Sequence, residues 1–305
     1  MAKRNRPRWV DGILVVNKPE GETSNTTLQR VKRLYAAKKA GHTGSLDPLA
    51  TGVLPICFGE ATKFSQYLLE SDKEYLVTAE LGVRTDTSDA QGEVVERRPV
   101  PNLTAADIEA VLENFRGELQ QIPSMFSALK YQGQPLYKWA RWGIEIERES
   151  RSIVVYNNQL VELSLPRFQL CIGCSKGTYV RTLIDDMGEM LGCGAHVVSL
   201  HRTKAGPFHQ AQAVDVAQLE QWVADREFKT LNKLLLPTVS AVSDWPEVRL
   251  TENTFYYVQQ GQPVVVPKSP TEGWVRLMMQ ETDQFVGVGE VLADGRIAPR
   301  RLVAL

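Results

Sequence analysis

The first quarter of the chain combines one continuous apolar run with amphipathic stretches. Residues 13–16 read Ile-Leu-Val-Val, and such an unbroken run predicts a buried strand. Ser24 or Asn25 is placed to cap a helix that follows. One face of this helix would carry the apolar residues Leu28, Val31, Leu34 and Tyr35, with lysines and arginines on the other face. Residues 75–81 alternate between apolar and polar, which is typical of a strand with one buried face.

The middle of the chain continues this mixture. Thr104 and Asp107 have the spacing of a helix-capping pair, and Gly117 ends the apolar periodicity that follows them. Residues 153–165 and 168–175 predict two paired strands, and residues 182–191 predict a helix that stops at Gly192. Strands and helices alternate without a strict βαβ rhythm. The pattern therefore predicts an α+β fold with a mixed, largely antiparallel central sheet.

The pattern changes after Pro237, where helical periodicity fades. Short apolar runs at 264–266, 274–279 and 285–292 then predict a small β domain. We therefore expect three parts along the chain. They are a basic N-terminal tail at 1–9, a large domain at 10–248 and a small C-terminal β domain at 249–305.

Composition and charge narrow the possible functions only a little. The chain has 305 residues with 43% apolar side chains, which suffices for a core, and its net charge of −1 does not indicate a nucleic-acid binder. No apolar run approaches the roughly 20 residues that cross a bilayer, and no signal peptide is evident, so we expect a cytoplasmic protein. Basic residues nevertheless gather at 1–9, 28–39, 130–142 and 296–301, which predicts one basic face suited to a polyanion.

The most informative short segment spans residues 41–52 and holds a single acid, Asp47. Asp47 is the first acid after Glu22, and the residues between them offer only cations and the imidazole of His42. The glycines permit positive φ, and Pro48 disfavours a helical Asp47, so we expect a shaped loop rather than a helix or strand. Asp47 is then either a turn residue before a proline or a carboxylate in an active site that binds a polyanion.

Longer motifs separate these two interpretations. Residues 41–55 read Gly-His-Thr-Gly-Ser-Leu-Asp-Pro-Leu-Ala-Thr-Gly-Val-Leu-Pro, which resembles the catalytic signature of the TruB family of tRNA pseudouridine synthases. The resemblance extends from about residue 12 to the C-terminus. It implies the pseudouridine synthase fold, with a cleft across the central sheet, and a PUA-like C-terminal domain that contacts tRNA. Further blocks match the family in the same order at 17–19, 59–63, 73–75, 84–89, 122–124, 127–130 and 175–181.

The resemblance also implies roles for single residues. Asp47 matches the essential aspartate of the family, and Arg181 matches the arginine that pairs with it. Three positions, His42, Tyr75 and Tyr179, match residues that handle the flipped nucleotide. Leu200 matches a further position of the pocket, and Lys18 matches a position that supports the active site. The implied reaction isomerises uridine 55 in the T loop of tRNA, and it needs no cofactor and no metal.

Each of these residues also has a purely structural interpretation. His42 could serve as a hydrogen-bonding residue of the loop, and Tyr75 as an ordinary strand aromatic. Tyr179 and Leu200 could belong to the core. Arg181 could precede a helix that begins at Thr182 and pair with Asp185 on the surface, although an arginine at that end of a helix opposes the helix dipole.

A second unusual segment covers residues 123–151, where cations and aromatics alternate. This composition suits phosphate neutralisation and base stacking, as in Tyr137-Lys138-Trp139. An amphipathic helix that uses Leu136 and Trp139 as core is the alternative. In the resembled family this position is an insertion that clamps the T arm of tRNA, so we expect a mobile loop that RNA orders.

Two other functions remain open on the sequence. The first is a catalytically silent protein that binds or folds tRNA on the same scaffold. The second is a metal hydrolase that uses Asp47 and His42 together with thiols at zinc-like spacing. Cys171 and Cys174 lie in a predicted strand, however, where an offset of three sends side chains to opposite faces. We expect reduced thiols, no metal, no cofactor and a monomer. In the metal-hydrolase hypothesis, the thiols and the further imidazole would be those of Cys171, Cys174, Cys193 and His196.

Overall fold

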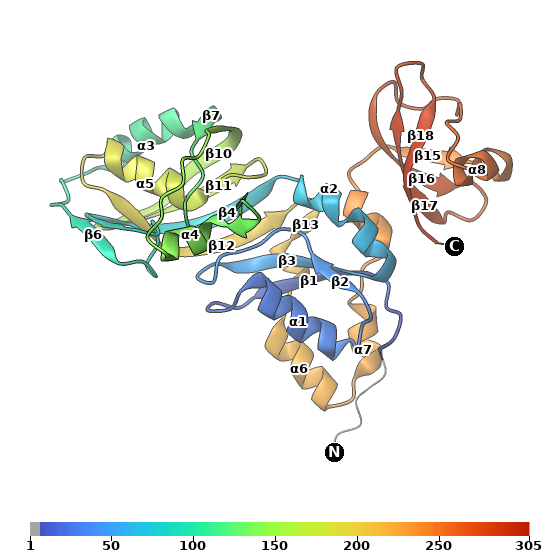
Figure 1. Ribbon diagram of the computed structural model, residues 1–305, viewed down its shortest axis with the longest axis horizontal. Helices are drawn as coiled ribbons and strands as arrows, with labels where there is room; N and C mark the ends of the chain where they lie inside the picture. The colour runs from blue at the N-terminus through green and yellow to red at the C-terminus, as the bar shows by residue number, and fades with distance from the viewer. Residues whose placement is uncertain (1–6, 305) are drawn as a thin grey trace.

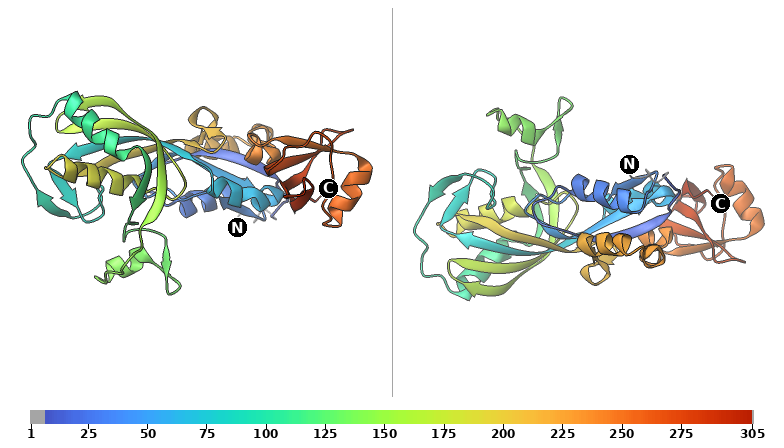
Figure 2. Two further views of the ribbon diagram at one scale, coloured as in Figure 1. Left: turned by 90° about the horizontal axis from the view of Figure 1, so that it is seen from above. Right: turned by 90° about the horizontal axis from the view of Figure 1, so that it is seen from below.

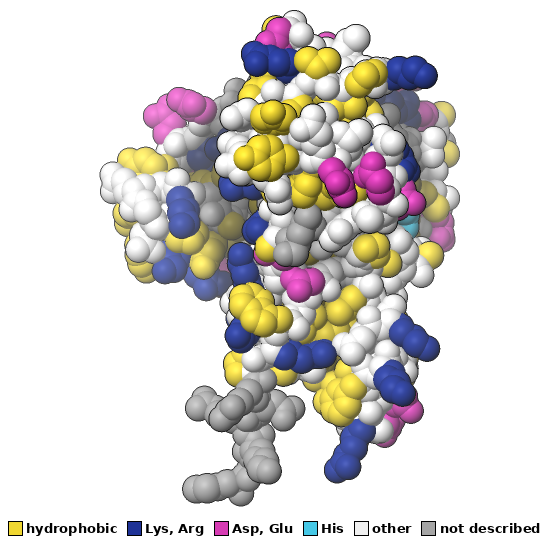
Figure 3. Space-filling view, turned by 90° about the vertical axis from the view of Figure 1, so that its right-hand side faces the viewer, with side chains coloured by type: hydrophobic (Ala, Val, Ile, Leu, Met, Phe, Trp, Pro, Cys, Tyr) yellow, Lys and Arg dark blue, Asp and Glu magenta, His cyan; other side chains and the backbone are white. Residues whose placement is uncertain are grey.

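The computed structural model describes residues 7–304, so most of the expected basic tail at 1–9 lies outside the described residues. A large domain is built on one long sheet, and a smaller sheet follows at the C-terminus (Figure 1). No helix within 7–304 is long and apolar enough to cross a membrane. On the face in Figure 3, Lys and Arg side chains lie among Asp and Glu, so that face is not uniformly basic.

The large sheet has the strand order β14-β1-β3-β12-β4-β11-β10-β7, with β2 added to β3 and β13 to β12. Two neighbouring pairs, β1/β14 and β3/β12, are parallel, and the other pairs are antiparallel. The predicted α+β fold with a mixed, largely antiparallel sheet is thus confirmed. The strands are β1 (Gly12–Lys18), β2 (Ala40–His42), β3 (Thr51–Phe58), β4 (Lys73–Leu81), β7 (Gly117–Gln121), β10 (Arg151–Ser164), β11 (Arg167–Cys174), β12 (Ala195–Ala205), β13 (Phe208–His209) and β14 (Val214–Asp215).

Helices cover the sheet because each carries one apolar face. In the first half of the sheet, Leu28 and Val31 of α1 pack with Val216 and Leu219 of α6 over β1. In the second half, α3 and α5 pack on β4, β10, β11 and β12. The helices of the large domain are α1 (Ser24–Leu34), α2 (Ser65–Leu69), α3 (Ala105–Leu112), α5 (Val180–Met190), α6 (Val216–Ala224) and α7 (Phe228–Lys233), with 3-10 turns η1 (Gly59–Phe64), η2 (Glu113–Phe115), η3 (Gln210–Gln212) and η4 (Thr238–Val242).

Two helix starts differ from the prediction. The cap of α1 is Thr23, whose side chain accepts a hydrogen bond from Thr26 N at 3.1 Å, rather than Ser24 or Asn25. Ser24 is not available for this role because its hydroxyl accepts a hydrogen bond from Leu46 N at 2.7 Å. Helix α5 begins at Val180, two residues before the predicted start. The capping pair predicted for α3, at Thr104 and Asp107, is confirmed.

Residues 123–151 project from the side of the large domain, in green in Figure 2. They form a two-stranded hairpin, β8 (Lys130–Tyr131) with β9 (Gln134–Pro135), followed by α4 (Leu136–Arg141). Leu136 is buried, as the helical alternative predicts, and Trp139 is partly buried against Tyr131 and Trp142. The mobility expected for this segment stays a prediction. A second small hairpin, β5 (Val83–Thr85) with β6 (Val94–Arg97), leads into the large sheet.

The C-terminal sheet has the order β15-β16-β17-β18, which confirms the small β domain. Its first strand starts at Glu247, two residues before the expected start at 249, and the apolar pattern did not reveal its helix α8. Tyr67 of α2 contacts Trp245 and Trp274 at ring-centroid distances of 5.0 and 5.2 Å, which docks this sheet on the large domain. The elements are β15 (Glu247–Leu250), α8 (Glu252–Gln259), β16 (Gly273–Met279), β17 (Phe285–Val291) and β18 (Ile297–Leu302).

Candidate active site

The loop that carries Asp47 connects β2 to β3, near the middle of the large sheet. Gly44 and Gly52 have φ values of +120° and +101°, so both adopt the backbone conformation that other residues avoid. Ser24 holds the loop through its hydroxyl, which bonds both Leu46 N and Leu46 O. The observed loop is shorter than the loop expected at 41–52, because His42 still pairs with Ile56 and Thr51 already begins β3.

Asp47 and Arg181 form a direct ion pair. Arg181 Nε lies 2.8 Å from Asp47 Oδ2, and the side chains are 5% and 40% exposed respectively. Arg181 also donates to Thr87 O at 2.8 Å and to Phe126 O at 3.1 Å, so three separate segments hold its guanidinium. The alternative pairing of Arg181 with Asp185 is wrong, because Asp185 bonds Arg84 at 2.9 Å.

The environment of Asp47 acts on its acidity in two directions. Burial raises the pKa of the Asp47 carboxyl, and the nearby charge of Arg181 opposes that rise. The carboxylate of Asp89, 3.4 Å from Arg181 Nη1, raises the Asp47 pKa again. Since 40% of the Asp47 side chain faces open space, water offsets part of the burial effect. The net direction is upward, towards a carboxyl that is easier to protonate than a free aspartate.

A cavity of about 290 Å³ lies in front of this ion pair. Asp47, Arg181, Tyr75, Tyr179 and Leu200 all line it, so the structure brings together five of the seven residues that the sequence singled out. Its walls combine the apolar side chain of Leu200 with two phenol rings and the charged pair. Such a mixture suits a planar, polar, uncharged ring.

His42 lines a neighbouring and larger hollow that shares Asp47 and Arg181 with the cavity. Its Nδ1 atom is buried and has no hydrogen-bond partner among the described residues. Burial, and then the positive charge of Arg202, lower the pKa of His42. The imidazole is therefore neutral at neutral pH.

Lys18 lies behind the cavity rather than in it. The side chain is fully buried, and Nζ donates to Pro19 O at 2.7 Å, Glu22 O at 2.6 Å and Pro48 O at 3.4 Å. Burial lowers the pKa of Lys18 to about 8. Lys18 thus connects the turn after β1 to the residue that follows Asp47.

Comparison with known proteins agrees with this geometry. The chain is 53% identical over 307 residues to tRNA pseudouridine synthase B of Coxiella burnetii, with 99% of each chain covered. It is 55% identical over 309 residues to tRNA pseudouridine synthase B of Vibrio vulnificus, with 99% of this chain and 98% of that one covered. The chain belongs to the TruB family of pseudouridine synthases. It is therefore an isomerase that forms pseudouridine in RNA.

Family models and solved structures extend the TruB assignment along the chain. The TruB family pseudouridylate synthase N-terminal domain matches residues 32–180, and two TruB C-terminal domain models match 181–243 and 246–303. A chain in a Cbf5-Nop10-Gar1 complex has a TM-score of 0.73 at 26% identity, with 96% of this chain and 84% of that one covered. A chain in an H/ACA RNP bound to substrate RNA has a TM-score of 0.74 at 24% identity, with 96% and 85% covered, and shows the shared fold.

Sequence reasoning missed three polar residues at this TruB-family site. Arg202 and Lys73 line the cavity, and the buried Asp89 contacts Arg181. A signal for Arg202 existed, because it lies two residues after Leu200 in a strand and therefore on the same face. Asp89 lies within a block that matched the family, at 84–89, but that block carried no assigned role.

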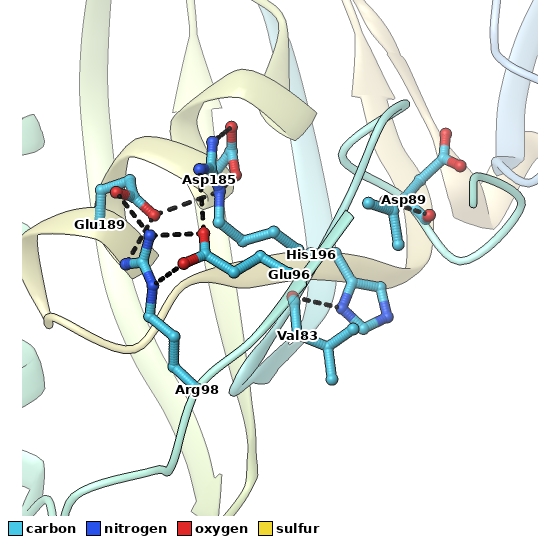
Figure 4. Close-up of polar contacts among 9 residues, drawn as sticks. Val83, Asp89, Glu96, Arg98, Asp185, Glu189 and His196 are labelled. Atoms are coloured by element: carbon cyan, nitrogen blue, oxygen red, sulfur yellow. Dashed lines mark hydrogen bonds and ion pairs between the residues drawn. The ribbon is translucent and has the colours of Figure 1, made fainter. Parts of the chain in front are cut away.

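The cysteines of this TruB-family chain do not converge. Along β11, Cys174 is buried while Cys171 lies on the other, partly exposed face, as the offset of three predicts. His196 donates through Nδ1 to Val83 O at 3.0 Å, beside an ion-pair network that includes Glu96, Arg98, Asp185 and Glu189 (Figure 4). Within residues 7–304, no three His, Cys, Asp or Glu side chains are grouped to hold a metal ion. The metal-hydrolase hypothesis is supported only by the spacing of the cysteines and His196 in the sequence.

Proposed function

We propose that this TruB-family enzyme converts uridine 55 in the T loop of tRNA to pseudouridine, with Asp47 as the essential carboxylate. One observation carries the proposal. Asp47 is exposed to a cavity large enough for one base while it is paired with the buried Arg181. The curated relatives above are named as tRNA pseudouridine synthases, which supports tRNA as the substrate class.

The chemistry requires the target base to leave its stack before it can reach such a cavity. The N1–C1′ bond then breaks, the uracil turns, and C5 bonds C1′ while a proton leaves C5 and another is gained at N1. Asp47 acts in its ionised form, on the base or on the ribose. Arg181 keeps it ionised and fixes its direction.

The other lining residues would hold the flipped nucleotide. In this proposal the ring of Tyr75 would stack on the uracil, and Leu200 and Tyr179, which also line the cavity, would complete the pocket. His42 lies in the neighbouring hollow, where its neutral imidazole could occupy the space that the base leaves. Lys18 keeps Pro48, and so Asp47, in position.

The T arm would be held by the projecting segment 123–151, with its exposed Lys130, Tyr131 and Arg141, and by the C-terminal sheet. The expected monomer stays a prediction. A tRNA-modifying role also supports the cytoplasm as the location. A metal or other cofactor is not part of the proposed mechanism.

Mapping of pseudouridine on an unmodified tRNA transcript, in buffer with chelator, tests the proposal. We expect product at position 55 with the native protein and none with Asp47→Asn, whose tRNA affinity stays within about threefold because many phosphate contacts carry binding. Asp185→Asn is the matched control, since Asp185 also pairs with an arginine but lies outside the cavity. Tight tRNA binding without product in the native protein would support the silent RNA-binding alternative.

A further inference from the structure

Arg202 in β12 is the largest fully buried side chain in residues 7–304, with 1% exposure. Its Nε donates to Val53 O at 2.7 Å, and Nη2 donates to Gly44 O at 3.2 Å. Gly44 precedes Asp47 and Val53 follows it. One guanidinium therefore connects the two ends of the loop that carries Asp47.

The charge of Arg202 has no direct partner. Among residues 7–304 its Nε and Nη2 donate to those two carbonyls, the hydroxyl of Tyr75 lies against its guanidinium, and no carboxylate there forms an ion pair with it. Burial of a cation without a carboxylate is unfavourable. Arg181, by contrast, contacts both Asp47 and Asp89. Asp47 and Asp89 thus share Arg181, and neither forms an ion pair with Arg202.

Arg202 also faces the cavity. It lines the cavity together with Gly44 and Tyr75, and a Cβ atom on Gly44 would lie 3.8 Å from Arg202 Nη1. A guanidinium has five N–H donors, and the two carbonyls occupy only some of them. The Nη1 side of the guanidinium lies next to Gly44 at the cavity wall, which Arg202 shares with Tyr75.

We propose that Arg202 is a positioning residue for the reaction, which fixes the Asp47 loop against Tyr75 and turns an uncompensated positive charge towards the base in the cavity. This inference rests on the proposed function. When the N1–C1′ bond breaks, its electron pair stays with the uracil. A fixed positive charge matters most at that step, because it is worth more in a cavity from which water is excluded than in solution.

The rate of the bound complex separates this role from a role in RNA binding. We expect Arg202→Gln to lower the single-turnover rate at saturating tRNA about 100-fold, while the tRNA Kd stays within about threefold. Arg202→Lys keeps the charge and should recover about tenfold of that loss. Arg116→Gln is the matched control, because Arg116 also donates to a main-chain carbonyl, Asn158 O at 2.7 Å, but lies outside the cavity. It should leave both quantities unchanged.

The titration of His42, followed by NMR, gives a second measurement that needs no turnover. The charge of Arg202 lowers the pKa of His42, so Arg202→Gln should raise that pKa and Arg202→Lys should leave it low. A structural role alone would not separate the two variants in this way. If Arg202→Gln does not fold, Arg202→Lys is compared with the native protein alone.

Three results would overturn the inference. The first is a native single-turnover rate in Arg202→Gln or in Arg202→Lys. The second is a loss in these variants that is confined to tRNA affinity. The third is a His42 pKa that does not change when the charge at position 202 is removed. Failure of the proposed function looks different. The native protein would then form no pseudouridine at position 55, while the His42 titration could still report the charge of Arg202.

Discussion

Asp89 lies 3.4 Å from Arg181, Oδ2 to Nη1, and so shares with Asp47 the guanidinium that neutralises it. Asp89 is 4% exposed, and its Oδ1 accepts hydrogen bonds from Thr87 Oγ1 at 2.7 Å and Gln91 N at 3.0 Å. The second carboxylate is therefore held by its own loop, whereas Asp47 is open to the cavity. This asymmetry supports the proposal that Asp47 carries out the chemistry, and it suits Asp89 to a supporting contact with Arg181.

Asp89→Asn should move the acid limb of the pH–rate profile to lower pH. The negative charge of Asp89 raises the pKa of Asp47, and in the proposed mechanism the ionised Asp47 is the working form. Activity falls as the pH drops through the Asp47 pKa, so a lower pKa keeps the enzyme active at lower pH. Single-turnover rates between pH 4 and 8 test this. An acid limb that moves to higher pH would contradict it.

Arg181→Gln should shift the same limb in the opposite direction and lower the plateau rate. Loss of the guanidinium charge leaves burial unopposed, so the pKa of Asp47 rises further. Arg84→Gln is the control, since it breaks an ion pair with Asp185 of similar geometry outside the cavity. Equal profiles for the two variants would show that Arg181 does not act on Asp47.

Gly52→Ala should destabilise the fold by about 2–4 kcal/mol and lower activity. A Cβ atom there would lie 2.3 Å from Arg202 O, and the φ of +101° is strained for alanine. Gly41→Ala is the matched control, because a Cβ atom at Gly41 meets nothing within 4 Å. Thermal unfolding of both variants checks the prediction, which fails if they lose equal stability.

Lys18→Met should change how stability depends on pH. The pKa of Lys18 in the folded protein, about 8, lies below its unfolded value. The contribution of Lys18 to the free energy of unfolding therefore increases as the pH rises between about 8 and 10.5. The gain of the native protein relative to the variant should reach up to about 3 kcal/mol across that window. Denaturant unfolding at several pH values measures it. If the difference in the free energy of unfolding between the two proteins did not change with pH, the pKa of Lys18 would not be lowered in the folded protein.

The sequence predicted the strands and helices whose periodicity is long, such as β4, β10 and α1. It missed α8, because an eight-residue helix with Phe255 and Val258 has too few apolar positions to show a period. It also misplaced the cap of α1, because the hydroxyl of Ser24 is used by Leu46, which lies 22 residues further along the chain. Only the folded chain shows that competition.

The candidate site likewise contains residues that the sequence predicted and residues that it missed. Asp47 and its pocket neighbours were indicated by the motif and its resemblance, and their roles stay predictions that the variants above test. Arg202 bonds main-chain carbonyls and Asp89 contacts Arg181, and no spacing along the chain encodes these contacts. A motif indicates the residues that meet the substrate more readily than those that hold them in place.

The parallel ladder between β3 and β12 joins the two halves of the sheet through two residue pairs in the described part of the chain, Thr51 with His201 and Gly52 with Arg202. Asp47 lies on one side of this seam, and Tyr75, in β4, lies on the other. Leu46 and Leu49, on either side of Asp47, pack in the same hydrophobic core as Val77 of β4, so apolar contacts cross the seam as well. The spacing between the carboxylate and the phenol ring is therefore set by two kinds of contact at once, the short ladder and the shared core.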